Sequence, residues 1–319
     1  MMKQLTYYLF LVAASASCAP SNVLQLEVIN PARFTFPDTG NILILNASYL
    51  PSSVFDKSNI ISQMTVREKQ IYDTLILANV FKGLFEVLNE SPAESIKNAE
   101  YFEMRTDDTV NFLSPLDPDE VKQICQNNSS DYLVSMEYYA FNSIKTQYET
   151  SWGEWEKILG VSYQINWRVY RNDGELLDQM MDRDTLYWYS DSEASYRVPE
   201  LINSVREVFF LAGKKFGKRI SPYWSDDSLN FYQIFSYGDD ISLDREHLVE
   251  LVTSKKRNQA YKACYNLAVL SESEDKLQEA VSWMDKAESI KQSETINNYR
   301  KKLEQRLENK IMIDQQTGF

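Results

Sequence analysis

The sequence predicts an α+β protein in which helices cover a mixed β-sheet, an α/β sandwich, and an all-α helical domain follows it. Three patterns predict this architecture. Short β-type runs alternate with amphipathic helical segments over residues 41–221. From His247 onward the apolar periodicity is helical throughout. The length of 319 residues suits about two domains.

The domain at 41–221 begins with strands and helices in turn. The predicted elements are a loose strand at 23–29, a strand at 41–45, a helix at 71–88, a strand from Tyr101, a helix from about Pro118, and strands at 132–141 and 161–169. The last of these alternates apolar and polar residues strictly, which is typical of a half-buried strand. Asn172, Asp173 and Gly174 then form a hairpin turn into a further strand.

A long helix closes this domain. Pro199 opens it, and an apolar stripe continues to Ile220. Gly213 and Gly217 lie one turn apart within it, so we expect the helix to lie close against the sheet at this point. Residues 222–246 lose the periodicity and become rich in aromatic and acidic residues, which predicts a connector.

The helical domain at 247–312 has the spacing of a tetratricopeptide repeat. Leu267, Ala268, Ala280 and Ala287 have the spacing of such a repeat, in which the small residues let two antiparallel helices approach closely while Leu267 and Met284 fill the space around them. The sequence therefore predicts a tetratricopeptide-like domain. A last amphipathic helix ends near Ile311, and 313–319 is predicted to be a frayed tail.

The start of the chain has the layout of a secretory signal. Residues 1–17 combine Lys3 with a short apolar run, and the small residues Ala16 and Ser17 precede Cys18. This arrangement resembles a bacterial lipobox, in which the cysteine is acylated and becomes the mature N-terminus. It predicts a signal peptide, lipidation at Cys18 and a lipidated segment at 18–40. The alternative is an ordinary secretory signal that leaves Cys18 as an incidental thiol.

Composition excludes several classes of function. With Lys+Arg 33 and Asp+Glu 46, the net charge of −13 repels nucleic acid. His247 is the single histidine, which excludes the usual zinc ligand sets and any histidine-based triad that does not use it. We predict no cofactor, no metal and no catalytic residue. Cys125 and Cys264 are each flanked by helical pattern, so buried unpaired thiols are expected rather than a disulfide.

Several longer stretches carry a family resemblance. They are Cys18, "LEVINPARFTFP", "NILILN", "SSDYLVSMEYY", "INWRVYRNDGELLDQ", "AGKKFGKRISPYW" and "KACYNLAVLSESEDKLQEAVSWMDKA". Together they resemble an uncharacterised lipoprotein family of Bacteroidetes, a domain of unknown function with a tetratricopeptide-like C-terminal region. The resemblance implies a lipoprotein of the cell envelope, anchored to the outer membrane on its periplasmic or surface face.

Two functions from different classes follow as expectations. The first is a non-enzymatic protein–protein interaction or assembly scaffold, whose helices bind an envelope protein or peptide partner. Its expected contact residues are Tyr261, Tyr265, Asn266 and Trp283. The alternative is a lipoprotein that binds or processes polysaccharide.

The polysaccharide alternative depends on Trp152 and Trp155 in "SWGEWEKI", between two predicted strands. Such rings can stack on a sugar or anchor a protein partner, because they offer a large contact area at low entropic cost. They can also fold back onto the domain's own core, and burial of this kind is the more common arrangement of tryptophan.

Overall fold

The computed structural model describes residues 22–48, 64–97, 99–104, 114–149, 151–153, 155–190, 197–236 and 239–317. These residues divide into two compact units, which we call the sheet unit and the helical unit. The sheet unit holds Ile29–Tyr223 and the residues from Ile313 onward, and the helical unit holds the residues up to Val28 and Trp224–Met312. The predicted signal segment and Cys18 lie outside the described residues.

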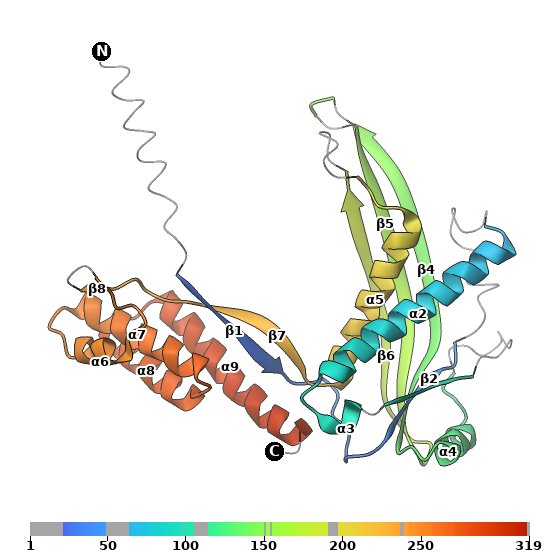
Figure 1. The fold of residues 1–319 in the computed structure, drawn as a ribbon, viewed down its shortest axis with the longest axis horizontal. Helices are drawn as coiled ribbons and strands as arrows, with labels where there is room; N and C mark the ends of the chain where they lie inside the picture. Colours follow the sequence, from blue (N-terminus) through green and yellow to red (C-terminus); the bar gives the residue numbers. More distant parts are fainter. Residues whose placement is uncertain are drawn as a thin grey trace. The chain divides into compact units, whose positions relative to one another are not determined.

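A mixed sheet organises the sheet unit (Figure 1). Its strands are β2 (Ile42–Asn46), β3 (Glu100–Glu103), β4 (Tyr132–Glu149), β5 (Trp155–Arg171) and β6 (Leu176–Tyr189). They lie in the order β3-β2-β4-β5-β6, with β2 parallel to both of its neighbours and the β4–β5 and β5–β6 pairs antiparallel. With the helices described below, this confirms the predicted fold class.

Helices cover both faces of this sheet. They are α2 (Val66–Glu90), α3 (Glu94–Lys97), α4 (Pro118–Asn127) and α5 (Leu201–Ile220). The two long helices α2 and α5 lie on one face (Figure 1), where the rings of Trp167 and Phe216 stack with their centroids 4.2 Å apart. On the opposite face α4 packs Cys125 with Leu43 and Tyr170. The main core therefore lies between the sheet and the α2–α5 pair.

Glycines set the distance between α2 and α5. A Cβ atom on Gly213 would lie 1.9 Å from the carbonyl oxygen of Val80, and one on Gly83 would lie 2.0 Å from that of Phe210. No side chain fits at either position, so the two backbones touch. The expectation that Gly213 brings α5 close to the sheet is therefore wrong, because this glycine faces α2.

The buried stripe of α2 also differs from the predicted one. Its buried apolar residues are Leu75, Ile76, Val80, Phe81, Leu84, Val87 and Leu88. The apolar spacing of the predicted helix at 71–88 also puts Ile71 and Ala78 on this face, but both are exposed. Because α2 packs against both the sheet and α5, it buries a wider stripe than a helix with one neighbour does. That stripe is centred on Val80 and Leu84.

The helical unit contains four helices and short strands among the described residues. They are β1 (Val23–Asn30), β7 (Tyr223–Asn230), β8 (Phe235–Ser236), β9 (Asp239–Asp240), α6 (Arg245–Val252), α7 (Arg257–Ser273), α8 (Leu277–Ile290) and α9 (Glu294–Thr317). β1 and β7 pair as a two-stranded sheet. Ala268 of α7 and Ala280 and Ala287 of α8 are fully buried in the core of this unit, as the spacing predicted.

Two segments differ from their sequence interpretation. Residues 222–246 were predicted as a connector, but they contain β7, β8 and β9, whose short and mixed runs give no clear alternation. The predicted tail at 313–319 is helical as far as Thr317, because α9 continues through it.

One further expectation concerns the two thiols. Cys125 and Cys264 are buried and unpaired, as predicted. Among the described residues, every helix is too short or too polar to cross a lipid bilayer.

Candidate functional site

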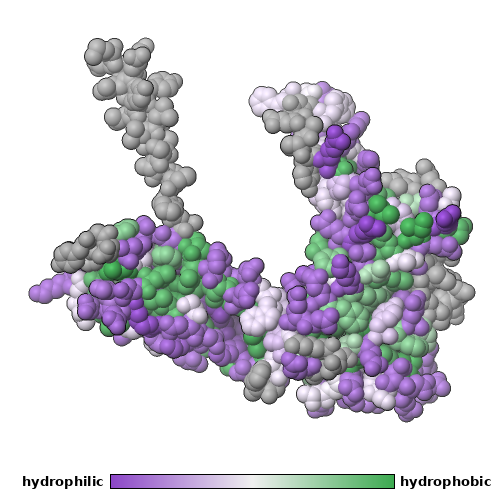
Figure 2. Space-filling view, viewed as in Figure 1, coloured by the Kyte–Doolittle hydropathy of each residue, from purple (hydrophilic) through white to green (hydrophobic). Residues whose placement is uncertain are grey.

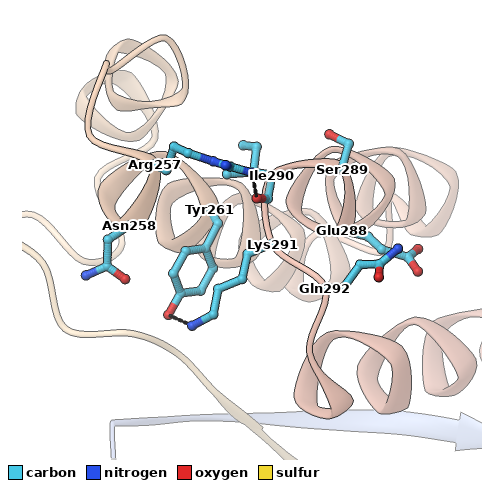
Figure 3. Close-up of a pocket in the computed structure, with 8 residues that line it drawn as sticks. All are labelled: Arg257, Asn258, Tyr261, Glu288, Ser289, Ile290, Lys291 and Gln292. Atoms are coloured by element: carbon cyan, nitrogen blue, oxygen red, sulfur yellow. Dashed lines mark hydrogen bonds between the residues drawn. The ribbon is translucent and has the colours of Figure 1, made fainter.

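A cavity of about 640 Å³ opens in the helical unit between the first turn of α7 and the end of α8 (Figure 3). It is lined by Arg257, Asn258, Tyr261, Glu288, Ser289, Ile290, Lys291 and Gln292. The first three residues belong to α7, and the others to the last turn of α8 and the residues after it. Because α7 and α8 are held together by buried alanines, the position of this cavity is fixed by the core of the unit.

Cationic side chains define the chemistry of this cavity. Arg257 donates a hydrogen bond from Nη2 to the carbonyl oxygen of Ile290 at 2.7 Å, which satisfies a carbonyl at the end of α8. The Nζ of Lys291 lies 3.4 Å from the hydroxyl of Tyr261 and 4.4 Å from the centre of its ring. Figure 3 shows these two side chains pointing toward one another. Glu288 supplies the carboxylate of the lining, and it pairs with Arg300 at 3.4 Å.

Neither cation has an acidic partner in the part of the chain that the structure describes. Within it, no carboxylate lies within ion-pair distance of Arg257 or Lys291. The cavity can therefore accept a carboxylate through the Lys291 ammonium and the Arg257 guanidinium. The Tyr261 ring borders the cavity behind Lys291 and is only 5% exposed, so it positions the ammonium.

Tyr261 is the expected contact residue that lines this cavity. Tyr265 is buried, with its ring centre 4.9 Å from that of Tyr232 and 5.0 Å from that of Tyr299. This burial raises the pKa of Tyr265 to about 12. Trp283 donates its indole N–H to the Glu279 carboxylate at 3.1 Å. Tyr265 and Trp283 therefore contribute to internal packing and hydrogen bonding.

Asn266 is also a structural residue. Its side-chain oxygen accepts a hydrogen bond from the Tyr232 N–H at 2.8 Å, and its Nδ2 donates to the carbonyl oxygens of Tyr232 at 2.6 Å and Ser242 at 2.7 Å. A fully buried amide with three such bonds holds the segment around 232–242 on α7. The expectation that Asn266 offers a partner contact is corrected by this burial.

Trp152 and Trp155 lie at the end of the β4–β5 hairpin, in the turn and at the start of β5 respectively. Their side chains are 88% and 58% exposed. They do not fold back onto the core among the described residues, and β4 beside them is exposed from Ile144 to Glu149. Sequence periodicity ended the strand at Phe141 and so gave no sign of this projection.

The carboxylates of β6 have a structural role. Asp182 accepts hydrogen bonds from the Tyr163 hydroxyl at 2.8 Å and from Lys215 of α5 at 2.6 Å. Asp184, two residues further on the same strand face, lies 3.4 Å from Lys215. These contacts hold α5 on the sheet. Among the described residues, no group of three His, Cys, Asp or Glu side chains is placed to hold a metal ion.

These features define a two-unit α+β protein with a surface cavity in its helical unit. The family described as "Domain of unknown function (DUF8603)" matches residues 39–232, and the chain belongs to this family. A second family, "Domain of unknown function (DUF6340)", matches residues 247–305.

The chain is similar to a solved structure and matches none of the curated proteins. One solved structure, described as a homolog of the neuraminyllactose-binding hemagglutinin from Helicobacter pylori, is similar at 10% identity, over 56% of this chain and 83% of that one. Its TM-score is 0.32.

Proposed function

We propose that this chain is a lipid-anchored, non-enzymatic interaction protein of the bacterial cell envelope, and that its helical unit binds an acidic segment of a partner protein. One observation carries the proposal. Arg257 and Lys291 flank a cavity with an aromatic wall, and no carboxylate of the described residues neutralises either cation. In a chain with a net charge of −13, such a site selects an acidic ligand by local charge.

The helical pattern of the unit supports the same function. The tetratricopeptide-like spacing of α7 and α8 is typical of helix pairs that present a surface to peptides. A peptide carboxylate would pair with Lys291, which the buried ring of Tyr261 holds in place, and with Arg257. The partner is an envelope protein or peptide that carries acidic residues.

Charge reversal at Lys291 tests the peptide site. We expect Lys291→Glu to weaken binding of a fluorescein-labelled peptide of alternating Glu and Leu about tenfold, measured by fluorescence anisotropy, because the attraction to a partly desolvated charge becomes a repulsion. Lys301→Glu is the matched control, since this exposed lysine of α9 lies outside the cavity lining and its reversal changes the net charge equally.

Two results would contradict the proposed site. If wild type and Lys291→Glu bind the peptide equally, the peptide does not bind at the cavity. If Lys301→Glu weakens binding as much as Lys291→Glu does, the effect comes from the net charge of the protein. A peptide of alternating Lys and Leu should bind wild type more weakly than the acidic peptide does.

Lipid anchoring depends on the proposed modification of Cys18. Acyl chains contribute about 0.8 kcal/mol per buried CH2, so lipidation holds a protein at a membrane while an unmodified chain is released. We expect Cys18→Ala to move the protein from the membrane fraction to the soluble fraction and to abolish incorporation of an alkyne-labelled fatty acid. Persistent labelling in Cys18→Ala would contradict this assignment.

A further inference from the structure

Exposed rings gather at one end of β4, β5 and β6, the end that carries the β4–β5 turn. Tyr187 and Tyr189 of β6 are 54% and 51% exposed, and Ile144 and Tyr148 of β4 are exposed as well. Figure 2 shows a group of pale residues, intermediate in hydropathy, at this end of the long strands. Large apolar and aromatic side chains are normally buried, and a group of them at one place marks an interaction surface.

The strand register places four of these side chains on one face. Ile144 pairs with Gly160, which pairs with Tyr187; in the next row of the same face, Ile158 pairs with Tyr189. Tyr148 pairs with Glu156 one row further. Residues two apart on a strand share a face. Ile144, Tyr148, Ile158, Tyr187 and Tyr189 therefore form one surface, which we call the tyrosine face.

Gly160 lies between Ile144 and Tyr187 on the tyrosine face and leaves space for their side chains. A Cβ atom at this position would lie 2.9 Å from the Cγ2 of Ile144 and 2.9 Å from the Cε1 of Tyr187. The side chains of Ile144 and Tyr187 therefore lean over the glycine from the two flanking strands, into the space that a larger residue would fill. The ring centres of Tyr187 and Tyr189 are 6.4 Å apart, with an interplanar angle of 34°.

The chemistry of this face is aromatic and rich in hydroxyl groups, with little charge. Its rings carry three phenol hydroxyls, and Thr146, which pairs with Ile158 and lies between Ile144 and Tyr148 on β4, adds another hydroxyl. Of the residues that the structure describes in these three rows, Glu156 is the one that is charged, and it accepts a hydrogen bond from the Tyr148 hydroxyl. That bond raises the pKa of Tyr148.

We propose that the tyrosine face binds a neutral oligosaccharide chain. A sugar ring offers a C–H face that packs on an aromatic ring and hydroxyls that pair with phenols and a carboxylate. The low formal charge of the face matches an uncharged ligand. A bilayer fits less well, because insertion of this end would bring the carboxylates of Glu149 and Glu156 into the interface.

Four neutral hexasaccharides test the proposal: maltohexaose, cellohexaose, xylohexaose and mannohexaose. We expect at least one to bind the chain from residue 19 onward with saturation by titration calorimetry. Tyr187→Ala and Tyr189→Ala should each weaken that binding about fivefold, since each removes one stacked ring. Gly160→Ala should also weaken it, because the new methyl group displaces Ile144 and Tyr187 while all the rings remain.

Trp155→Ala is the matched control. Trp155 is an exposed ring of the same hairpin, but it pairs with Glu149 and so points from the opposite face. Its removal should change the affinity less than twofold. Lys291→Glu should leave sugar binding unchanged, which separates this site from the proposed peptide site.

Three results would overturn the proposal. The first is that no hexasaccharide binds. The second is that Trp155→Ala weakens binding as much as Tyr187→Ala does. The third is that the chain binds phosphatidylcholine vesicles but none of the sugars, and that Tyr187→Ala no longer binds the vesicles. This result would assign the tyrosine face to a lipid surface.

Discussion

Replacing Gly213 with alanine should destabilise the sheet unit by about 3 kcal/mol, near the upper end of the usual cost of an overpacked core. The added Cβ atom would lie 1.9 Å from the carbonyl oxygen of Val80 and 2.9 Å from the amide nitrogen of Leu84. Both are backbone atoms, so no side chain can rotate away. α2 and α5 must separate along their whole contact, and the gain of about 1 kcal/mol in helix propensity offsets only part of this cost.

Urea denaturation followed by circular dichroism measures this effect. Asn203→Ala is the matched control, because Asn203 is an exposed residue near the start of the same helix. Its free energy of unfolding should change by less than about 0.5 kcal/mol, as for an ordinary surface position. A Gly213→Ala variant as stable as Asn203→Ala would show that the two helices do not touch at this position.

Local periodicity was enough to predict much of the fold. The stripe of α5, from Val205 to Ile220, is buried as its spacing indicated, and so are the paired alanines of α7 and α8. In each case the residues that share a face are separated by one or two turns. A pattern of this kind shows which face is buried but not what covers it, so Gly213 was assigned to the sheet instead of α2.

The candidate sites were harder to predict, because they depend on distant segments. Asn266 is buried by a loop that precedes it by more than twenty residues, and nothing around position 266 indicates that loop. Arg257 and Lys291 line the same cavity only because α7 and α8 fold into a hairpin. The spacing of apolar residues does not indicate where exposed cations will lie. Tyr187 and Tyr189 alternate with their neighbours as the residues of any strand do, so the pattern does not indicate that they are exposed.

A buried ion pair lies on the face of the sheet that α2 and α5 do not cover. Arg168 of β5 pairs with Glu137 of β4, and both side chains are buried. Glu137 also accepts a hydrogen bond from the Tyr170 hydroxyl at 2.6 Å, and Arg168 donates to the carbonyl oxygen of Ser114 at 2.9 Å. Glu137 stands at an irregularity in the β4–β5 register, between Met136 and Tyr138. Such a pair is costly to break from one side, because the partner charge stays buried.

Arg168→Met should therefore lower the free energy of unfolding by about 4 kcal/mol at pH 7.5. Burial already raises the pKa of Glu137 above its ordinary value of 4.5, and the guanidinium opposes this rise. Without Arg168 the folded-state pKa rises further, while the unfolded-state pKa stays where it was. A group with a raised folded pKa contributes stability that is present below its unfolded pKa and lost as pH rises through the folded value.

The deficit of Arg168→Met relative to wild type should thus shrink as pH falls from 7.5 toward 4.5, because Glu137 takes up a proton. Urea titrations of both proteins over this range measure it. Adding Glu137→Gln to Arg168→Met removes the buried charge, so the double variant should recover part of the loss at pH 7.5 and lose the dependence on pH. A deficit that stays constant with pH, with no recovery in the double variant, would mean that Arg168 stabilises the sheet by packing alone.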